Sequence, residues 1–413
     1  MREAWIIDAC RTPRGIGKVG KGSLADLHPQ HVGAAVLSAL AQRNHLKTDE
    51  VDDIIWGTST QAGRQGNDLG RMAALDAGYD VRASGITINR FCGSGITAVS
   101  LAAAKIMAGM DDVVVAGGTE MMSFRSSLPK DPTLPQLPDA GNTRLRARHP
   151  QTQQGICADA IATLEGIERE ALDHLSFVSQ QRAAAAISEG RFDRSLVPVY
   201  REDGTLALDR EEFPRPQTTL EGLAALAPSF EAMADVAVGD DGATFGDLIR
   251  RVYPELKIRH VHHAGSSSGV VDGAAAILLV SPEYAEKHGL KPRARVLATA
   301  EMGDSPTLML NAPVPAAHKV LKRAGLTPDD IDLWEINEAF AVVAEKFIRD
   351  LRLDRDKVNV NGGAIALGHP IGATGSILIG TMLDELERQD LKRGLVTRCA
   401  AGGMAPAIII ERI

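Results

Sequence analysis

The sequence has little of what several protein classes require. It has four cysteines in 413 residues and no C-x-x-C pair, so neither a disulfide framework nor a cysteine-rich zinc site is predicted. No apolar run approaches the roughly 18 to 20 residues that cross a bilayer, and the N-terminus lacks the apolar core of a signal peptide. Acidic residues outnumber basic ones, 53 to 45, which argues against a nucleic-acid surface. These absences predict a cytoplasmic protein with no membrane span and no nucleic-acid partner.

Aliphatic residues and glycine are abundant instead. Hydrophobic residues make up 44% of the chain and glycine occurs 40 times, whereas aromatic residues make up only 4%. This composition is typical of an α/β protein with many tight turns between strands and helices. The chain is too long for one compact core, so two or three subdomains are expected.

The hydrophobic pattern predicts the first elements of such a fold. A strand is expected at Ala4–Ala9, a helix at about His31–Arg43, and a buried strand at Asp53–Trp56. Another buried strand is expected at Val113–Ala116, ending at the glycine pair Gly117–Gly118.

A helix, a polar turn and a strand that ends near a tryptophan occur twice in the chain. Trp334 follows Trp56 by 278 residues (334 − 56), and His369 follows Cys92 by 277 residues (369 − 92). Chance similarity between two α/β units is the alternative, but the shared offset favours a duplication. Cys92 and His369 would then lie at equivalent helix N-termini.

Cys92 and His369 each stand among residues that suit chemistry. Cys92, in N-R-F-C-G-S-G, precedes an Ala-rich stretch that predicts a helix, and a helix N-terminus stabilises a thiolate. A buried cysteine that only fills space is the alternative there. His369 lies in the loop N-G-G-A-I-A-L-G-H-P-I-G-A-T-G, which leads into a helix near Gly372. A structural histidine and a phosphate-binding loop are the alternatives there.

Two further polar residues follow predicted strand ends. Cys399 lies in V-T-R-C-A-A-G-G-M-A, and Asn337 lies in W-E-I-N-E-A-F-A. Asn337 either caps the following helix or orients a ligand group. Each motif alone is equally consistent with a structural role.

Together these four motifs resemble those of the thiolases, and the resemblance covers essentially the whole chain. The loop around His369 is the most specific piece. The resemblance implies an α/β duplicated thiolase fold with layers in the order αβαβα and an inserted loop domain. It divides the chain into an N-terminal half, a CoA-binding loop domain and a C-terminal half. The ranges are 1–121 plus 271–291 for the N-terminal half, 122–270 for the loop domain and 292–413 for the C-terminal half.

The resemblance implies an acyl-CoA:acetyl-CoA C-acyltransferase, which joins acetyl-CoA to an acyl-CoA and, in reverse, cleaves a 3-oxoacyl-CoA with CoA. Cys92 would take the acyl group and His369 would remove its proton. Cys399 would be the second acid/base, and Asn337 would hold a water of one oxyanion hole. The other oxyanion hole would use the Cys92 amide and an amide of the C-A-A-G-G turn.

The same resemblance places CoA against Arg215, Leu226, Ala264 and Ser268. CoA and the acyl-CoAs would be substrates, with no permanently bound cofactor and no metal. The expected assembly is a homodimer or homotetramer, and the expected setting is fatty acid metabolism, including β-oxidation.

The chain departs from the family pattern at two places of interest. Ala401 stands where the family has the first glycine of C-x-G-G-G, which puts the second oxyanion hole in question. An insertion between Phe230 and Ala264 contains F-G-D-L-I-R-R-V-Y-P-E-L, a predicted amphipathic helix, and shapes either the acyl pocket or a subunit contact. The adjacent R-H-V-H-H is predicted to be structural or solvated rather than metal-binding, and Cys157 is predicted to pack in a core.

Two rival functions remain open at this point. A condensing enzyme of the ketoacyl-synthase type would use one cysteine with two histidines, whereas here Cys399 occupies the last position. A non-catalytic thiolase-like CoA-binding subunit would typically lack the cysteine or the histidine, and this chain has both.

Overall fold

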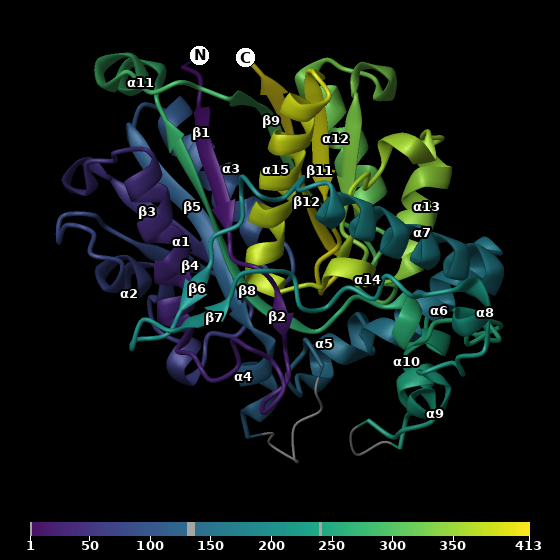
Figure 1. Cartoon of the computed structure of the whole chain (residues 1–413). Helices are drawn as coiled ribbons and strands as arrows, with labels where there is room; N and C mark the ends of the chain where they lie inside the picture. Colours follow the sequence, from purple (N-terminus) through teal and green to yellow (C-terminus); the bar gives the residue numbers. More distant parts are fainter. Residues whose placement is uncertain (1, 130–136, 239–241) are drawn as a thin grey trace.

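One mixed sheet of ten strands runs through the computed structural model, which describes residues 2–129, 137–238 and 242–413 (Figure 1). From its centre outward the first group of strands is β1, β8, β5, β3 and β4, with the short β2 beside β8. The second group is β9, β12, β11 and β10. The strand bounds are β1 Trp5–Arg11, β2 Gly15–Ile16, β3 Asp53–Gly57, β4 Ile86–Ile88, β5 Val113–Met121, β8 Val271–Val280, β9 Ala294–Gly303, β10 Leu333–Ile336, β11 Arg393–Thr397 and β12 Met404–Arg412.

The two groups of strands have the same directions. In each, the two inner pairs are antiparallel, and the next pair outward, β5 with β3 or β11 with β10, is parallel. Trp5 and Ile6 of β1 pair with Arg295 and Ala294 of β9, which joins the two groups at the centre. This correspondence confirms the predicted duplication.

Alternate residues of the strands face different cores, which produces a layered molecule. In β5, Val113 and Val115 pack in an outer core with α1, whereas Val114 and Ala116 pack in a central core with α3 and α15. The second group of strands has its own outer core under α12 and α13. The order is therefore helix, sheet, helix, sheet, helix, with α3 and α15 in the middle (Figure 1). The helix bounds are α1 Pro29–Arg43, α2 Leu69–Asp76, α3 Ser94–Met107, α11 Pro282–His288, α12 Pro313–Ala324, α13 Ala341–Leu351, α14 Ala364–Leu367 and α15 Ile371–Arg388.

A pair of equivalent carboxylates shows the duplication at atomic detail. The Asp52 carboxylate accepts the backbone N–H groups of residues 112 and 113 at 2.8 and 3.0 Å. The Asp332 carboxylate accepts those of residues 392 and 393 at 2.9 and 2.8 Å. All three positions are related by an offset of 280 residues (332 − 52, 392 − 112, 393 − 113). Each carboxylate ties the start of its strand, β3 or β10, to the start of the neighbouring parallel strand.

The predicted elements occur with small changes of their bounds. The first helix starts at Pro29, slightly before the predicted position, because proline suits the first helical position and the His28 side chain accepts the Gln30 N–H. The prediction that a strand ends at Gly117–Gly118 is wrong, because β5 continues to Met121. A Cβ on Gly118 would lie 2.3 Å from the Gly372 carbonyl oxygen, so this glycine lets the first turn of α15 lie against the strand.

The segment between β5 and β8 forms a lobe beside the layers, seen at the bottom and right of Figure 1. The helix predicted in the insertion is present as α10, and it buries Phe245, Leu248 and Ile249. Residues 130–136 of the proline-rich stretch and 239–241 of the insertion lie outside the described residues. The bounds here are α4 Met122–Ser127, α5 Thr143–Arg148, α6 Gln154–Glu165, α7 Arg169–Ser188, β6 Val199–Tyr200, β7 Leu206–Leu208, α8 Leu220–Ala224, α9 Glu231–Ala234 and α10 Phe245–Arg250. Among the described residues, no helix has both the length and the apolar character that crossing a membrane needs.

The equivalent carboxylates lead to a matched stability prediction. Asp52→Ala and Asp332→Ala should each lower the free energy of unfolding by a similar amount, about 1–3 kcal/mol, because each removes a charged acceptor from two backbone N–H groups. Urea denaturation measures both. Asp356→Ala is the control, because this side chain is 91% exposed and pairs only with Arg182, so a change within about 0.5 kcal/mol is expected. Equal effects of all three variants would contradict the assignment.

Candidate active site

Cys92 lies on a sharp turn between β4 and α3. Phe91 has a left-handed backbone with φ 49°, and its N–H donates to the Asn89 side chain at 2.7 Å. Ser94, the first residue of α3, accepts the Arg90 N–H at 2.9 Å and donates to the Phe91 carbonyl at 2.7 Å. The turn therefore presents Cys92, which is 7% exposed, two residues before the start of the helix. Strained backbone at such a position is typical of functional sites.

His369 is held between α14 and α15 by hydrogen bonds that also fix its tautomer. Its backbone N–H donates to the Gly269 carbonyl at 2.8 Å. Its Nδ1 lies 2.6 Å from the Thr374 hydroxyl oxygen, and that hydroxyl donates to the Pro370 carbonyl at 2.8 Å. Because the hydroxyl proton is used there, the oxygen accepts from Nδ1–H. The lone pair of the neutral ring is therefore on Nε2.

Cys399 lies at the end of β11, where the chain makes a tight turn into β12. Ala400 and Met404 exchange backbone hydrogen bonds of 2.7 and 3.1 Å across this turn. Gly402 and Gly403 have φ values of 78° and 74°, which glycine adopts without strain. The turn buries Cys399, whose exposed fraction is 1%.

Two backbone N–H groups near the cysteines are free to bind an oxyanion. Within the described ranges, neither the Cys92 N–H nor the Ala401 N–H has a hydrogen-bond acceptor. Ala401 lies outside the left-handed region that a family glycine would tolerate, so the alanine is accommodated without strain. The doubt that the sequence raised about this position is thus removed for the backbone geometry.

Burial determines the ionisation of the two proton-handling groups. It lowers the pKa of His369 well below the usual value, and the positive charges of Arg398 and Arg125 add to that lowering. Burial raises the pKa of Cys399 to about 12, and the nearby Cys92 sulfur adds to the rise, whereas Arg398 opposes it. At neutral pH His369 is therefore uncharged and Cys399 is a thiol.

Asn337 follows β10 and is 1% exposed. It does not cap α13, since Phe340 is the capping residue of that helix and has no side-chain cap. Neither the Nδ2 nor the Oδ1 atom of Asn337 has a partner in the part of the chain that the structure describes. Of the two roles left open by the sequence, the structure leaves the orientation of a ligand group.

Arg398 is a member of the site that the sequence analysis missed. Its side chain is fully buried, and its guanidinium donates to His369 Nε2 at 2.8 Å. It also lies close enough to Cys92 and Cys399 to interact with both sulfurs electrostatically. A signal was present, because Arg398 is a charged residue between a buried strand and a buried cysteine in V-T-R-C. Thr374, which fixes the His369 tautomer, was missed as well.

A cavity of about 700 Å³ opens onto these groups. Cys92, His369 and Ala401 line it, and so does Ser268. Its volume lies in the range of small-molecule sites. Cys399, Asn337 and Arg398 lie behind its wall. Apart from His369, the only charged residue that lines it is Arg125, counting described residues alone.

The four residues expected to contact CoA are spread over a wider surface. Ser268 lines the cavity, and its N–H donates to the Ala339 carbonyl at 3.0 Å. Leu226, which is 40% exposed, approaches Gly265, the neighbour of the exposed Ala264. Arg215 is exposed, and its guanidinium lies 5.6 Å from the centre of the Phe213 ring. These three residues do not line the cavity that contains Cys92.

The histidines of R-H-V-H-H pair with buried carboxylates. His260 and His262 place their Nδ1 atoms 2.8 and 2.7 Å from the two oxygens of Asp159, and His263 Nε2 lies 2.7 Å from Asp173. The His262 ring also contacts Phe340 edge-on. These pairs brace the loop that carries Asn337. Cys157 packs in the same core as Phe340, fully buried.

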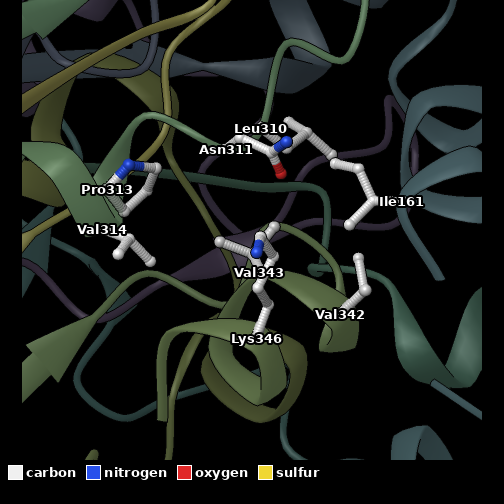
Figure 2. Close-up of a pocket in the computed structure, with 8 residues that line it drawn as sticks. All are labelled: Ile161, Leu310, Asn311, Pro313, Val314, Val342, Val343 and Lys346. Carbon is white, nitrogen blue, oxygen red and sulfur yellow. The ribbon is translucent and has the colours of Figure 1, made fainter. Parts of the chain in front are cut away.

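A second cavity lies apart from the cysteines and is too small for an acyl group (Figure 2). Its volume is about 10 Å³, about the space of one water molecule. The residues around it are Ile161, Leu310, Asn311, Pro313, Val314, Val342, Val343 and Lys346.

Comparisons with known proteins agree with this geometry. Residues 4–244 match the thiolase N-terminal domain, and residues 290–412 match the thiolase C-terminal domain. An acetyl-CoA acetyltransferase of Syntrophomonas wolfei is 39% identical, and a beta-ketoadipyl-CoA thiolase of Acinetobacter baylyi is 38% identical, each over the whole of both chains. The crystal structure of the Bacillus anthracis acetyl-CoA acetyltransferase superposes with a TM-score of 0.84 at 33% identity, covering 100% of this chain and 99% of that one. The chain belongs to the thiolase family.

Proposed function

We propose that this thiolase transfers acyl groups between CoA thioesters through an acyl thioester on Cys92. It joins acetyl-CoA to an acyl-CoA and, in the opposite direction, cleaves a 3-oxoacyl-CoA with CoA. The observation that supports this most is the meeting of Cys92 and His369 on one cavity, with Cys399 directly behind them. These residues come from segments far apart in the chain.

Each side chain has a defined task in this reaction. Cys92 attacks the carbonyl carbon and holds the acyl group, which divides one difficult carbon–carbon step into two easier ones. Cys399 removes the α-proton of acetyl-CoA in synthesis and returns it to the leaving carbanion in cleavage. His369, neutral at the pH of the reaction, is the acceptor expected for the Cys92 proton. It also contributes to holding the thioester oxygen.

Two sets of donors stabilise the oxyanions. The free N–H groups of Cys92 and Ala401 form one set, and His369 with a water held by Asn337 forms the other. A fixed donor at such a position typically contributes about 3–4 kcal/mol to the transition state. The unpartnered amide of Asn337 supports this role, since a buried polar group without a partner is costly unless a ligand or water uses it.

CoA binds along the surface from the cavity to the lobe of 122–270. Ser268 lies next to the pantetheine arm, Leu226 and Ala264 line its path, and Arg215 meets the phosphates of the nucleotide. CoA and acyl-CoA are substrates, and no cofactor or metal is held permanently. We also propose a cytoplasmic homodimer or homotetramer that acts in fatty acid metabolism, including β-oxidation.

The first test replaces the nucleophile. Cys92→Ser should lower thiolysis of acetoacetyl-CoA by about 10³-fold or more, because serine is a far poorer nucleophile beside a neutral imidazole. Loss of the magnesium-enolate absorbance of acetoacetyl-CoA measures the rate. Cys157→Ser, in a core away from the cavity, is the control and should keep its activity. A wild-type protein inactive on every 3-oxoacyl-CoA from short to long chains would favour a non-catalytic CoA-binding subunit.

A second test concerns the tautomer of His369. Thr374→Val removes the acceptor of Nδ1–H without changing the size of the side chain, so the ring can rotate or exchange its proton. We expect kcat/KM for thiolysis to fall by about tenfold or more. Thr374→Ser keeps the hydroxyl and should stay near the wild type. Equal rates for the valine and serine variants would show that this hydrogen bond is unimportant.

The insertion reaches the cavity through Met233 of α9, next to Phe230. Met233→Ala should enlarge the acyl pocket and raise the preference for longer over shorter 3-oxoacyl-CoAs by roughly tenfold. Steady-state thiolysis across chain lengths measures this ratio. Val252→Ala changes a residue of the same insertion that is 45% exposed and outside the cavity, so its profile should not change. A profile unaffected by Met233→Ala would exclude a role of α9 in acyl selection.

A further inference from the structure

Arg398 is a buried cation without a carboxylate. Its exposed fraction is 0%, and its Nε and Nη1 atoms have no hydrogen-bond partner within the described ranges. Arg11, which is 2% exposed, shows the usual solution, since Glu211 lies 2.7 Å from its guanidinium. Taking a guanidinium out of water is costly unless an anion faces it. The retention of Arg398 therefore requires an anionic partner in the working enzyme.

The groups around Arg398 limit what that partner is. Cys92 and Cys399 favour its charged form, whereas burial disfavours it, and no carboxylate of the described chain contributes. His369 accepts from the guanidinium, and Arg125 is the other cation whose charge reaches His369. Arg398 does not line the cavity, so an anionic part of a substrate would not reach it. The partner must be one of the two sulfurs.

Cys92 is the sulfur that suits this role. Cys399 is the weaker acid of a buried pair, with a pKa raised to about 12, so it keeps its proton at neutral pH. Cys92 lies two residues before the N-terminus of α3, where the helix dipole adds to the effect of a cation. The Nε2 lone pair of His369 is occupied by the Arg398 N–H and is not free to take a proton from Cys92 in the resting state.

We propose that Arg398 is the cation that holds Cys92 as a thiolate in the resting enzyme, beside a neutral His369. This inference rests on the proposed function, because it assigns the activation of the same nucleophile. Arg398 is a positioning residue in this account, since it acts on Cys92 and touches no substrate.

The proton balance of the cleavage reaction then becomes simple. The Cys92 thiolate forms a bond to the C3 carbonyl carbon, and the C2–C3 bond breaks. Its electron pair stays on the acetyl-CoA fragment, which takes the proton of the Cys399 thiol. The Cys399 thiolate then takes the proton of the incoming CoA thiol. The CoA thiolate attacks the acyl thioester, and the Cys92–carbon bond breaks to restore the Cys92 thiolate. One proton moves from CoA to acetyl-CoA through Cys399, and neither Cys92 nor His369 changes its protonation overall.

The test measures the ionisation of Cys92 without any turnover. Iodoacetamide alkylates a thiolate but hardly a thiol, so its rate at Cys92, followed by peptide mass, gives the pH midpoint. Removing a cation disfavours the thiolate, so Arg398→Met should move the midpoint upward by about 1 to 2 pH units, toward the ordinary thiol value of about 8.5. Alkylation at pH 6.5 should slow by about tenfold or more. Arg398→Lys keeps a charge and should lie between the two.

His369→Asn separates this account from activation by imidazole. We expect it to keep a low midpoint, because Arg398 remains. Arg125→Met removes the exposed cation and should shift the midpoint by less than about half a unit, since solvent screens an exposed charge. A shift in His369→Asn with none in Arg398→Met would overturn the proposal. An equal shift in Arg125→Met would overturn it as well.

Stability supplies an independent readout. Arg398→Met replaces a buried charge that lacks a carboxylate, so its thermal midpoint should not fall below that of the wild type. A variant that fails to fold would contradict the proposal, because Arg398 would then be structural. The ultraviolet absorbance of a thiolate in the wild type at neutral pH, lost when Cys92 alone is alkylated, tests the same point without a variant. A low midpoint in a protein without thiolysis would refute the proposed function alone, whereas thiolysis with an ordinary midpoint would refute this inference alone.

Discussion

The site depends on the direct contact of α3 with α15 at the centre of the molecule. Glycines make this contact possible, because a Cβ on Gly375 would lie 2.2 Å from the Ile96 nitrogen, and one on Gly95 would lie 2.9 Å from the Gly375 nitrogen. Any larger residue would push the two helix starts apart. Cys92 and His369 precede these starts, one in each copy of the repeat. The close approach of two backbones therefore brings the nucleophile and the histidine to one cavity.

Electrostatics in this centre differs from that of an exposed cysteine–histidine pair. Burial disfavours a charged imidazole, and the two arginines disfavour it further, so His369 is a poor partner for an anion in the resting state. The buried guanidinium of Arg398 is a stronger source of positive charge, because arginine stays protonated even when burial lowers its pKa. A charge that costs stability is thus placed where the reaction develops negative charge. The same pattern of strain and unpartnered polar groups at Phe91, Asn337 and Arg398 marks the site within an otherwise well-satisfied core.

The sequence predicted the parts of the site that local patterns define. Cys92 and His369 were identified because glycine-rich helix starts and a shared offset surround them, and the duplicated sheet confirms that offset. The Gly117–Gly118 pair was misread as a turn, since glycine permits both a turn and the close approach of another backbone. Only the packing of α15 against β5 distinguishes the two. Such contacts join residues hundreds of positions apart and leave no local signal.

Arg398 and Thr374 were missed for a related reason. An arginine before a cysteine at a strand end is normally solvated, and its burial follows from how β11, α3 and the His369 loop pack together. A threonine in the first turn of a helix is common, and its role follows from the orientation of one ring nitrogen. In both cases the residue acts through a neighbour, which the sequence alone does not place.

The central claim is that Cys92 accepts the acyl group. Incubation with radiolabelled acetyl-CoA without a second substrate, followed by peptide mapping, tests it directly. The account predicts label on the peptide that contains Cys92, released by free CoA. An unlabelled protein, or label on Cys399 instead, would contradict it.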